Sequence, residues 1–150
     1  MADDTDVLLR LCEHEWTQGK QSEDQRATIT NIVLLIASAV VGLIAQIGLN
    51  ARSYPLAFLL CVLGTFGAVA AEKLYERHQF HFGRARAYRG YVMRELHPSI
   101  QFDAVMEQAR AEHSAAFSRM GKLHLHHVWL ALHIGILLAG VTLTAMILTK

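Results

Sequence analysis

The amino-acid sequence predicts an all-α integral membrane protein with three transmembrane helices. Three long stretches contain no Lys, Arg, Asp or Glu, although the chain of 150 residues is only 53% hydrophobic. They cover about residues 29–49, 54–71 and 128–149. A bilayer core about 30 Å thick is crossed by roughly 20 apolar residues in a helix. Each stretch is therefore long enough to span a membrane, and we expect a single membrane domain over residues 1–150 rather than a soluble globular domain.

The first two spans are predicted to form a transmembrane hairpin over residues 28–72. The short segment 50–53 separates them, which is enough for a tight turn between two antiparallel helices. Before the hairpin, residues 1–27 contain seven acidic and three basic side chains. Apolar residues in this segment recur at helical spacing. We therefore expect a short N-terminal helix over residues 1–27.

The segment between the second and third spans, residues 73–126, is predicted to form a long helical hairpin. A helical stretch without proline is followed by His97-Pro98-Ser99, where the hairpin would turn. No proline occurs after Pro98. We therefore expect one helix of about 45 residues that starts near Asp103 and continues into the third transmembrane helix, residues 127–150.

Basic residues predict the orientation of the chain. Nine of the fourteen Lys and Arg residues lie in 73–126, and the cytoplasmic segments of membrane proteins are enriched in Lys and Arg. This distribution places the N-terminal helix and the hairpin in the cytoplasm. The 50–53 turn and the C-terminus are then periplasmic or extracellular.

Polar side chains inside the spans are candidates for gating, because hydrocarbon is a costly environment for them. We single out Asn31, Gln46 and His133. Asn31 and His133 are predicted to lie at a similar shallow depth below the cytoplasmic membrane boundary, where they could form a hydrogen bond between two helices. The alternative is that Asn31 anchors the first span and His133 is a core histidine with a satisfied ring.

Pairs of small residues four positions apart favour close packing of helices in lipid. Such pairs occur in all three spans: Ser38 and Gly42, Gly64 and Ala68, and Gly135 and Ala139. They pack helices within one chain or between copies of the chain, and both interpretations are open. Three spans form too thin a bundle to enclose an aqueous path, so a channel would require several copies.

The most distinctive segment, residues 75–89, combines arginines with aromatic residues and histidines. Its candidate anion-contacting residues are Arg77, Arg84, Arg86 and Arg89. They are interpreted as contacts to anionic lipid headgroups, as partners of the acidic N-terminal helix, or as ligands of a phosphate-bearing molecule. Residues 1–27 carry a net charge of −4 and residues 73–126 a net charge of +4, which favours pairing of the two segments.

Histidine and methionine residues form a second pattern, on one face of the helix expected before the third span. The members of this stripe are Met106, Arg110, His113, Phe117, Met120, His124 and His127. His124 and His127 are one turn apart and are candidate ligands for zinc or copper. The alternatives are a structural or interfacial role and pH-dependent gating.

Motifs of enzymes are absent from the sequence. It has no nucleophile elbow, phosphate-binding loop or metalloprotease motif, so we expect neither enzymatic activity nor a cofactor. The formal net charge is +1, which gives no indication of nucleic-acid binding.

A family resemblance rests on three features of the chain. These are the run from Glu15-Trp16 to Gln25-Arg26-Ala27-Thr28-Ile29-Thr30-Asn31, the tight two-span hairpin, and the pattern Tyr-Glu-Arg-His-x-Phe-His-x-x-Arg-Ala-x-x-Tyr-Arg at residues 75–89. Together they resemble small bacterial membrane proteins of the SLATT type (SMODS/SLOG-associated transmembrane effectors) and RipA-like oligomeric membrane proteins, over about residues 10–96. The resemblance implies an antiphage or conflict effector that assembles into a pore when a partner senses a nucleotide signal. The third span departs from that pattern, and no catalytic residues are implied.

These observations give a preferred hypothesis and two alternatives. The preferred function is that of a homo-oligomeric protein of the bacterial inner membrane, which forms a pore or perturbs the membrane under control of its cytoplasmic helices, in defence or stress. Its expected partners are further copies of the chain, anionic lipid headgroups and a cytosolic protein. The alternatives are a non-conducting scaffold that recruits a soluble partner through residues 73–126, and a His/Met metal-responsive membrane protein.

Overall fold

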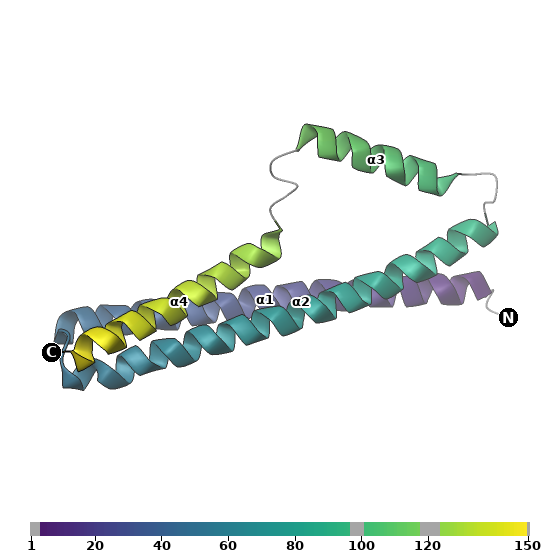
Figure 1. The fold of residues 1–150 in the computed structure, drawn as a ribbon. Coiled ribbons are helices and arrows are strands. Elements are labelled where there is room, and N and C mark those ends of the chain that lie inside the picture. Colours follow the sequence, from purple (N-terminus) through teal and green to yellow (C-terminus); the bar gives the residue numbers. More distant parts are fainter. Residues whose placement is uncertain (1–3, 97–100, 118–123, 150) are drawn as a thin grey trace. The chain divides into compact units, whose positions relative to one another are not determined.

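A computed structural model describes residues 4–96, 101–117 and 124–149, and these residues are helical with no strand. The elements are α1 (Asp4–Ile47), a short 3-10 helix η1 (Ala51–Ser53), α2 (Tyr54–Leu96), α3 (Phe102–Ala116) and α4 (Leu125–Leu148) (Figure 1). Within this part of the chain, α1, α2 and α4 are long and apolar enough to cross a membrane. The predicted all-helical fold with three apolar helices is confirmed.

The chain divides into two compact units. The first comprises residues 1–21 and 77–124, and the second comprises residues 22–76 and 125–150. The second unit contains the apolar parts of α1 and α2 together with α4. We call it the membrane unit, and the other one the hairpin unit.

The sequence predicts the first two spans as separate helices, but in the structure they are parts of longer ones. The predicted N-terminal helix over residues 1–27 is the first part of α1, which continues to Ile47, and the second span continues within α2 to Leu96. The physical reason is that neither segment contains an interior proline, which would remove a backbone hydrogen bond and break the helix.

The prediction of one helix from Asp103 into the third span is wrong. α3 ends at Ala116, Phe117 has non-helical angles (φ −123°, ψ 43°), and α4 begins at Leu125. All the described side chains of 103–117 are exposed, so burial does not stabilise a longer helix there. The predicted hairpin turn at His97-Pro98-Ser99 lies outside the described residues, between the end of α2 and the start of α3.

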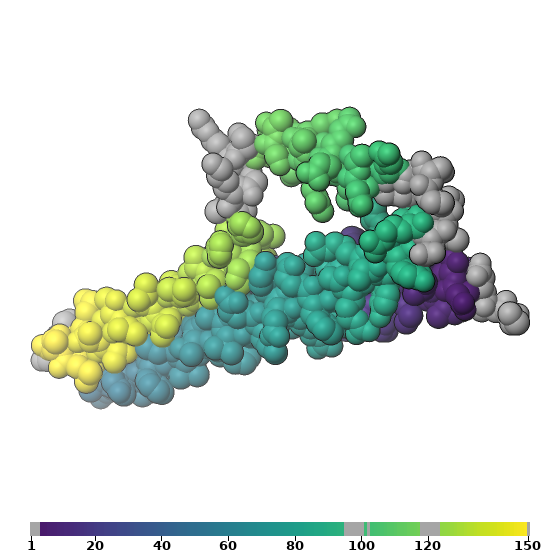
Figure 2. Space-filling model, turned by 45° about the vertical axis from the view of Figure 1, so that its right-hand side comes forward, coloured from purple at the N-terminus to yellow at the C-terminus, as the bar shows by residue number. Residues whose placement is uncertain are grey.

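The membrane unit is a bundle of three helices, in which α4 lies alongside both α1 and α2 (Figure 1). Figure 2 shows α4, in green to yellow, lying along α2. The buried hydrophobic side chains of α1 are Val33, Ala37, Val40 and Ile44, which follow spacings of four, three and four. This alternation keeps one face of a helix against its neighbours. Ala57, Leu60 and Ile147 complete the aliphatic core.

Glycines bring α2 and α4 into close contact. A Cβ atom on Gly64 would lie 2.5 Å from the Leu137 backbone nitrogen, and one on Gly140 would lie 2.7 Å from the Cys61 backbone nitrogen. A Cβ on Gly67 would collide with the His133 ring. These glycines therefore pack helices within one chain.

The turn between α1 and α2 is fixed by local backbone chemistry. Gly48 ends α1 with a φ of +83°, a conformation that favours glycine. The Asn50 side chain accepts a hydrogen bond from the Arg52 backbone N–H, and the Ser53 hydroxyl accepts one from the Asn50 backbone N–H. The predicted turn at 50–53 is confirmed.

The contact at Gly64 yields a prediction about stability. Because the atoms in the way of a new methyl group belong to the α4 backbone, Gly64→Ala should destabilise the bundle by about 1–3 kcal/mol. Thermal unfolding in detergent, followed by circular dichroism, measures this loss. Gly83→Ala is the control: Gly83 has open space around its Cα, so alanine should leave stability unchanged or raise it by up to about 1 kcal/mol. Equal melting temperatures for the two variants would contradict the packing described.

Candidate functional site

The outer face of α1 in the membrane unit carries polar and small residues among apolar ones, of which Leu35 is 72% exposed. Asn31, Ser38, Gly42 and Gln46 are all exposed. At 3.6 residues per turn they fall on one side of the helix, opposite the buried side that contains Val33 and Val40. The predicted gating candidates Asn31 and Gln46 therefore lie on the surface of the bundle. They share one side of α1 with the small residues Ser38 and Gly42.

Large apolar side chains dominate the outer face of α2, which also carries Thr65 but no amide or charged group within its apolar part. Phe58, Val62, Phe66 and Val69 are between 48% and 65% exposed. Such a face is suited to contact with lipid chains. The two outer faces of the bundle thus differ in chemistry, although both belong to helices of similar apolar length.

His133, the third gating candidate, is buried inside the bundle. Its side chain is 0% exposed, and its Nε2 atom lies 3.1 Å from the Thr30 hydroxyl. The expected pairing with Asn31 is wrong, because a shift of one residue turns a side chain by about 100° around the helix. Thr30 faces α4, whereas Asn31 faces outwards.

A layer of polar and aromatic residues lies about two turns before the aliphatic core. Arg26 is 3% exposed and forms an ion pair with Glu23. Its guanidinium carbon lies 5.8 Å from the centre of the Tyr75 ring and 5.7 Å from that of Trp129. Its Nε and Nη1 atoms have no hydrogen-bond partner among the described residues. Sequence reasoning missed this layer; the available signal was a lone arginine just before a span.

Tyr75 extends the same layer to the start of α4. Its ring stacks on that of His126 with 4.0 Å between the centres. The His126 Nε2 atom lies 3.0 Å from a carboxylate oxygen of Glu72. Polar contacts therefore connect all three helices of the membrane unit at this level.

The hairpin unit is held together by a buried carboxylate. Glu15 is 4% exposed, and its two oxygens lie 2.6 Å from His81 Nδ1 and 3.2 Å from an Arg84 guanidinium nitrogen. The hydrogen bond with Tyr88, and to a smaller extent the charge of Glu15, raise the pKa of Arg84, so its guanidinium stays protonated. The acidic N-terminal helix and the basic segment therefore pair within one chain.

Packing around Glu15 reinforces this pairing. The rings of Trp16 and Phe82 lie 4.4 Å apart, and the Cys12 thiol donates a hydrogen bond to the Ala85 carbonyl at 3.3 Å. A Cβ atom on Gly19 would collide with the Phe82 ring. Close approach of α1 and α2 in this unit thus requires a glycine at position 19.

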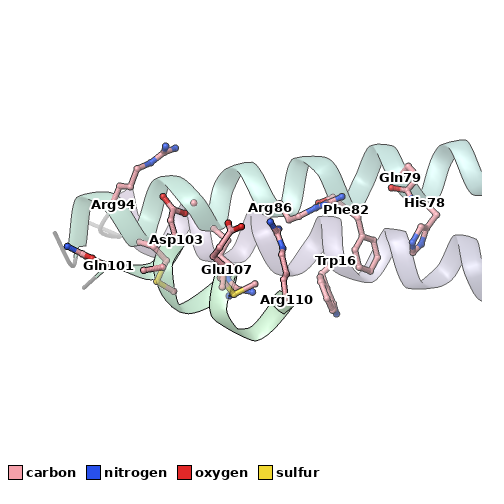
Figure 3. Close-up of a pocket in the computed structure, with 15 residues that line it drawn as sticks. Trp16, His78, Gln79, Phe82, Arg86, Arg94, Gln101, Asp103, Glu107 and Arg110 are labelled. Atoms are coloured by element: carbon pink, nitrogen blue, oxygen red, sulfur yellow. The ribbon is translucent and has the colours of Figure 1, made fainter. Parts of the chain in front are cut away.

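A cavity of about 1160 Å³ lies in the hairpin unit, lined by side chains of α1, α2 and α3 (Figure 3). Of the four predicted anion-contacting arginines, Arg86 and Arg89 line this cavity, Arg84 pairs with Glu15, and Arg77 is exposed outside it. Two further arginines line it, Arg94 and Arg110. Sequence reasoning missed Arg110 as an anion contact because its proximity to Arg86 depends on the packing of α3, and it missed Arg94 because that residue lies beyond the 75–89 segment of α2.

The histidine and methionine stripe does not form one helix face. Met106, Arg110 and His113 belong to α3, Phe117 follows its end, His127 belongs to α4, and Met120 lies outside the described residues. His124 and His127 are exposed. Among the residues that the structure describes, no group of three or more His, Cys, Asp or Glu could hold a metal ion. Metal binding by His124 and His127 stays a prediction.

Comparison with known proteins does not assign a family to this arrangement. No family model, no curated protein and no solved structure matches the chain. Function is therefore inferred from the surfaces and contacts described above.

The two partners of Glu15 should contribute unequally to stability. The His81 side chain is 15% exposed and that of Arg84 is 46% exposed, so solvent screens the arginine more strongly. In double-mutant cycles with Glu15→Ala, we expect a coupling energy of about 0.5–3 kcal/mol for His81→Ala and a smaller one for Arg84→Ala. Thermal unfolding of the four proteins of each cycle measures both. A larger coupling for Arg84 would contradict the geometry.

Proposed function

We propose that this chain is a bacterial inner-membrane protein that assembles into a homo-oligomer through the outer face of α1 and forms a pore controlled by its cytoplasmic helices. The observation that carries the proposal is the exposure of two amides, Asn31 and Gln46, on the outer face of α1, whereas large apolar side chains dominate the outer face of α2.

The Ser38 hydroxyl donates to the Leu34 carbonyl of its own helix, but a single copy in lipid would leave the exposed Asn31 and Gln46 amides without such a bond. Hydrocarbon supplies no hydrogen bonds, so exposed asparagine and glutamine amides are costly there. The cost is removed when the α1 face contacts another copy or lines water. The apolar face of α2 carries no such cost and is suited to the lipid side of an oligomer.

The location of the water path follows from the packing of one copy. Val33, Val40, Leu60 and Ile147 fill the space between the three helices. We therefore place the path between copies, where rings of Asn31, Ser38 and Gln46 would supply polar groups. A Cβ atom on Gly42 would meet nothing within 4 Å, so this part of α1 is open to the close approach of a neighbouring helix.

Charge and helix continuity support cytoplasmic control. The excess of Lys and Arg in 73–126 favours a cytoplasmic hairpin unit. α1 and α2 continue from the hairpin unit into the membrane unit without a break. A change in the contacts around Glu15 can therefore move the membrane-spanning part of the same helix, α1. The resemblance to SLATT-type effectors supports a role in defence or stress.

Removal of the two amides tests the proposal. Asn31→Leu combined with Gln46→Leu should weaken assembly, because each interhelical hydrogen bond in lipid is worth about 1–2 kcal/mol. We expect a smaller mass in detergent by native mass spectrometry and loss of ion flux from liposomes. Thr65→Val is the matched control, because Thr65 is exposed on α2 and bonds to the Cys61 carbonyl of its own helix. It should keep both mass and flux.

Three results would speak against the proposal. A wild-type protein that is monomeric in lipid nanodiscs would remove the oligomer. Stable oligomers that never release ions, with or without a cytosolic extract, would favour a non-conducting scaffold. An unchanged mass in the double variant would show that α1 does not form the interface.

A further inference from the structure

The cavity of the hairpin unit has the properties of a ligand site. We propose that it binds a soluble organic phosphate, with the phosphate held by arginines of α2 and α3 and an aromatic body stacked beside Trp16. This inference goes beyond the proposed pore, since it concerns binding alone and stands whether or not the protein conducts ions.

The cationic part of the site comes from two helices. Arg86 and Arg89 lie on α2 and Arg110 lies on α3, and all three line the cavity. Figure 3 shows the Arg110 side chain extending from α3 towards α2, whereas the Arg94 side chain extends from α2 away from α3. Among the described residues, none of these guanidinium groups forms an ion pair with a carboxylate.

The contacts that Arg86 and Arg89 do make are weak. Arg86 Nε donates to the Phe82 carbonyl at 3.3 Å, and Arg89 Nη2 lies 3.9 Å from the Met106 sulfur. Most donors of both groups are therefore available to a ligand. Guanidinium groups match phosphate oxygens in bidentate geometry, and an anion would relieve the repulsion between like charges on facing helices.

The apolar part of the site gives the ligand its second property. Trp16 is 44% exposed although it packs on Phe82, and Met106 is 41% exposed. Both line the same cavity as the arginines. The Lys20 ammonium lies over the Trp16 ring, 5.9 Å from its centre. A partly exposed indole next to cations favours a flat aromatic group attached to an anion, because aromatic groups stack on such a ring.

Two acidic residues also line the cavity, and their negative charge affects which anions can bind there. Asp103 lies in the first turn of α3, where a carboxylate stabilises the helix N-terminus. Glu107 has no such structural role and faces the same space as Arg110 in Figure 3. Its charge opposes anion binding, so the site should select a multiply charged phosphate over a single negative charge.

The position of the arginines along α2 favours a soluble ligand over a lipid headgroup. Arg86 is fifteen residues beyond Ala71, the end of the charge-free stretch, within the same helix. This corresponds to about 22 Å of helical rise. The attraction of an anionic membrane surface decays over about 8 Å at physiological salt. A phosphate free in solution is therefore the expected source.

Fluorescence of Trp16 provides the test. The chain has two tryptophans, so Trp129→Phe leaves Trp16 as the only indole reporter. The full-length protein in detergent is titrated with adenosine 5′-monophosphate, inorganic phosphate and adenosine, which separate the combined ligand from its charge and its ring. We expect saturable quenching by the monophosphate, with a dissociation constant about tenfold or more below that of either fragment. Calorimetry on the wild-type protein repeats the measurement without the substitution.

Variants assign the binding to the cavity. Arg89→Gln with Arg110→Gln should weaken monophosphate binding about tenfold or more, whereas Glu107→Gln should tighten it. Arg77→Gln is the control on the same helix, because Arg77 lies outside the cavity. Circular dichroism checks that each variant keeps its helical content, and the opposite signs expected for Arg110 and Glu107 exclude a general loss of folding.

The outcomes that overturn the inference are distinct from those that overturn the pore. Absence of saturable quenching in both fluorescence and calorimetry rejects the site. Equal weakening by Arg77→Gln rejects the cavity as its location. A lipid source is shown if the monophosphate does not bind and nanodiscs with phosphatidylglycerol change Trp16 fluorescence, relative to phosphatidylcholine alone, in an Arg89- and Arg110-dependent way.

Discussion

In the membrane position that we propose, hydrocarbon offers a polar side chain no hydrogen-bond partner except protein or trapped water, and the polar residues of the membrane unit are best understood from this constraint. Between α1 and α4, the Thr30 hydroxyl lies 3.1 Å from His133 Nε2, whereas His133 Nδ1 and the Thr144 hydroxyl are buried without a hydrogen-bond partner among the described residues. Gly67 makes room for that histidine ring. Asn31 and Gln46 face away from the bundle instead. The pairing of Thr30 with His133 is made within one copy, whereas the outer face of α1 is the part for which we propose a second copy.

The hairpin unit depends on a different interaction, the pairing of an acidic side chain of α1 with basic side chains of α2. Glu15 is buried and depends on His81 and Arg84 for compensation, since an unpaired buried carboxylate is strongly destabilising. Arg86 and Arg89 lie on the same helix as Arg84 but line the cavity. The basic segment thus divides its arginines between a structural ion pair and the site for which we propose an organic phosphate.

The sequence predicts the features of this chain that depend on composition and local chemistry. Apolar length defines the three spans, and the 50–53 turn follows from residues adjacent to it. Features set by rotation or by distant contacts are not predictable in this way. Whether Thr30 or Asn31 faces His133 depends on the packing angle of α1, and the approach of Arg110 to Arg86 depends on where α3 lies. No proline follows α3 and the nearest glycine, Gly121, lies five residues beyond Ala116, so a continuous helix was expected there.

Disulfide cross-linking in bacterial membranes can show whether α1 faces a second copy in an oligomer. Single cysteines are placed at Ser38 or Gly42 on α1, and at Val62 or Phe66 on α2, in a chain with Cys12→Ser and Cys61→Ala. We expect cross-linked dimers from the α1 positions and none from the α2 positions after mild oxidation. Cross-links from α2 alone, or from neither helix, would contradict the proposal that α1 forms the interface between copies.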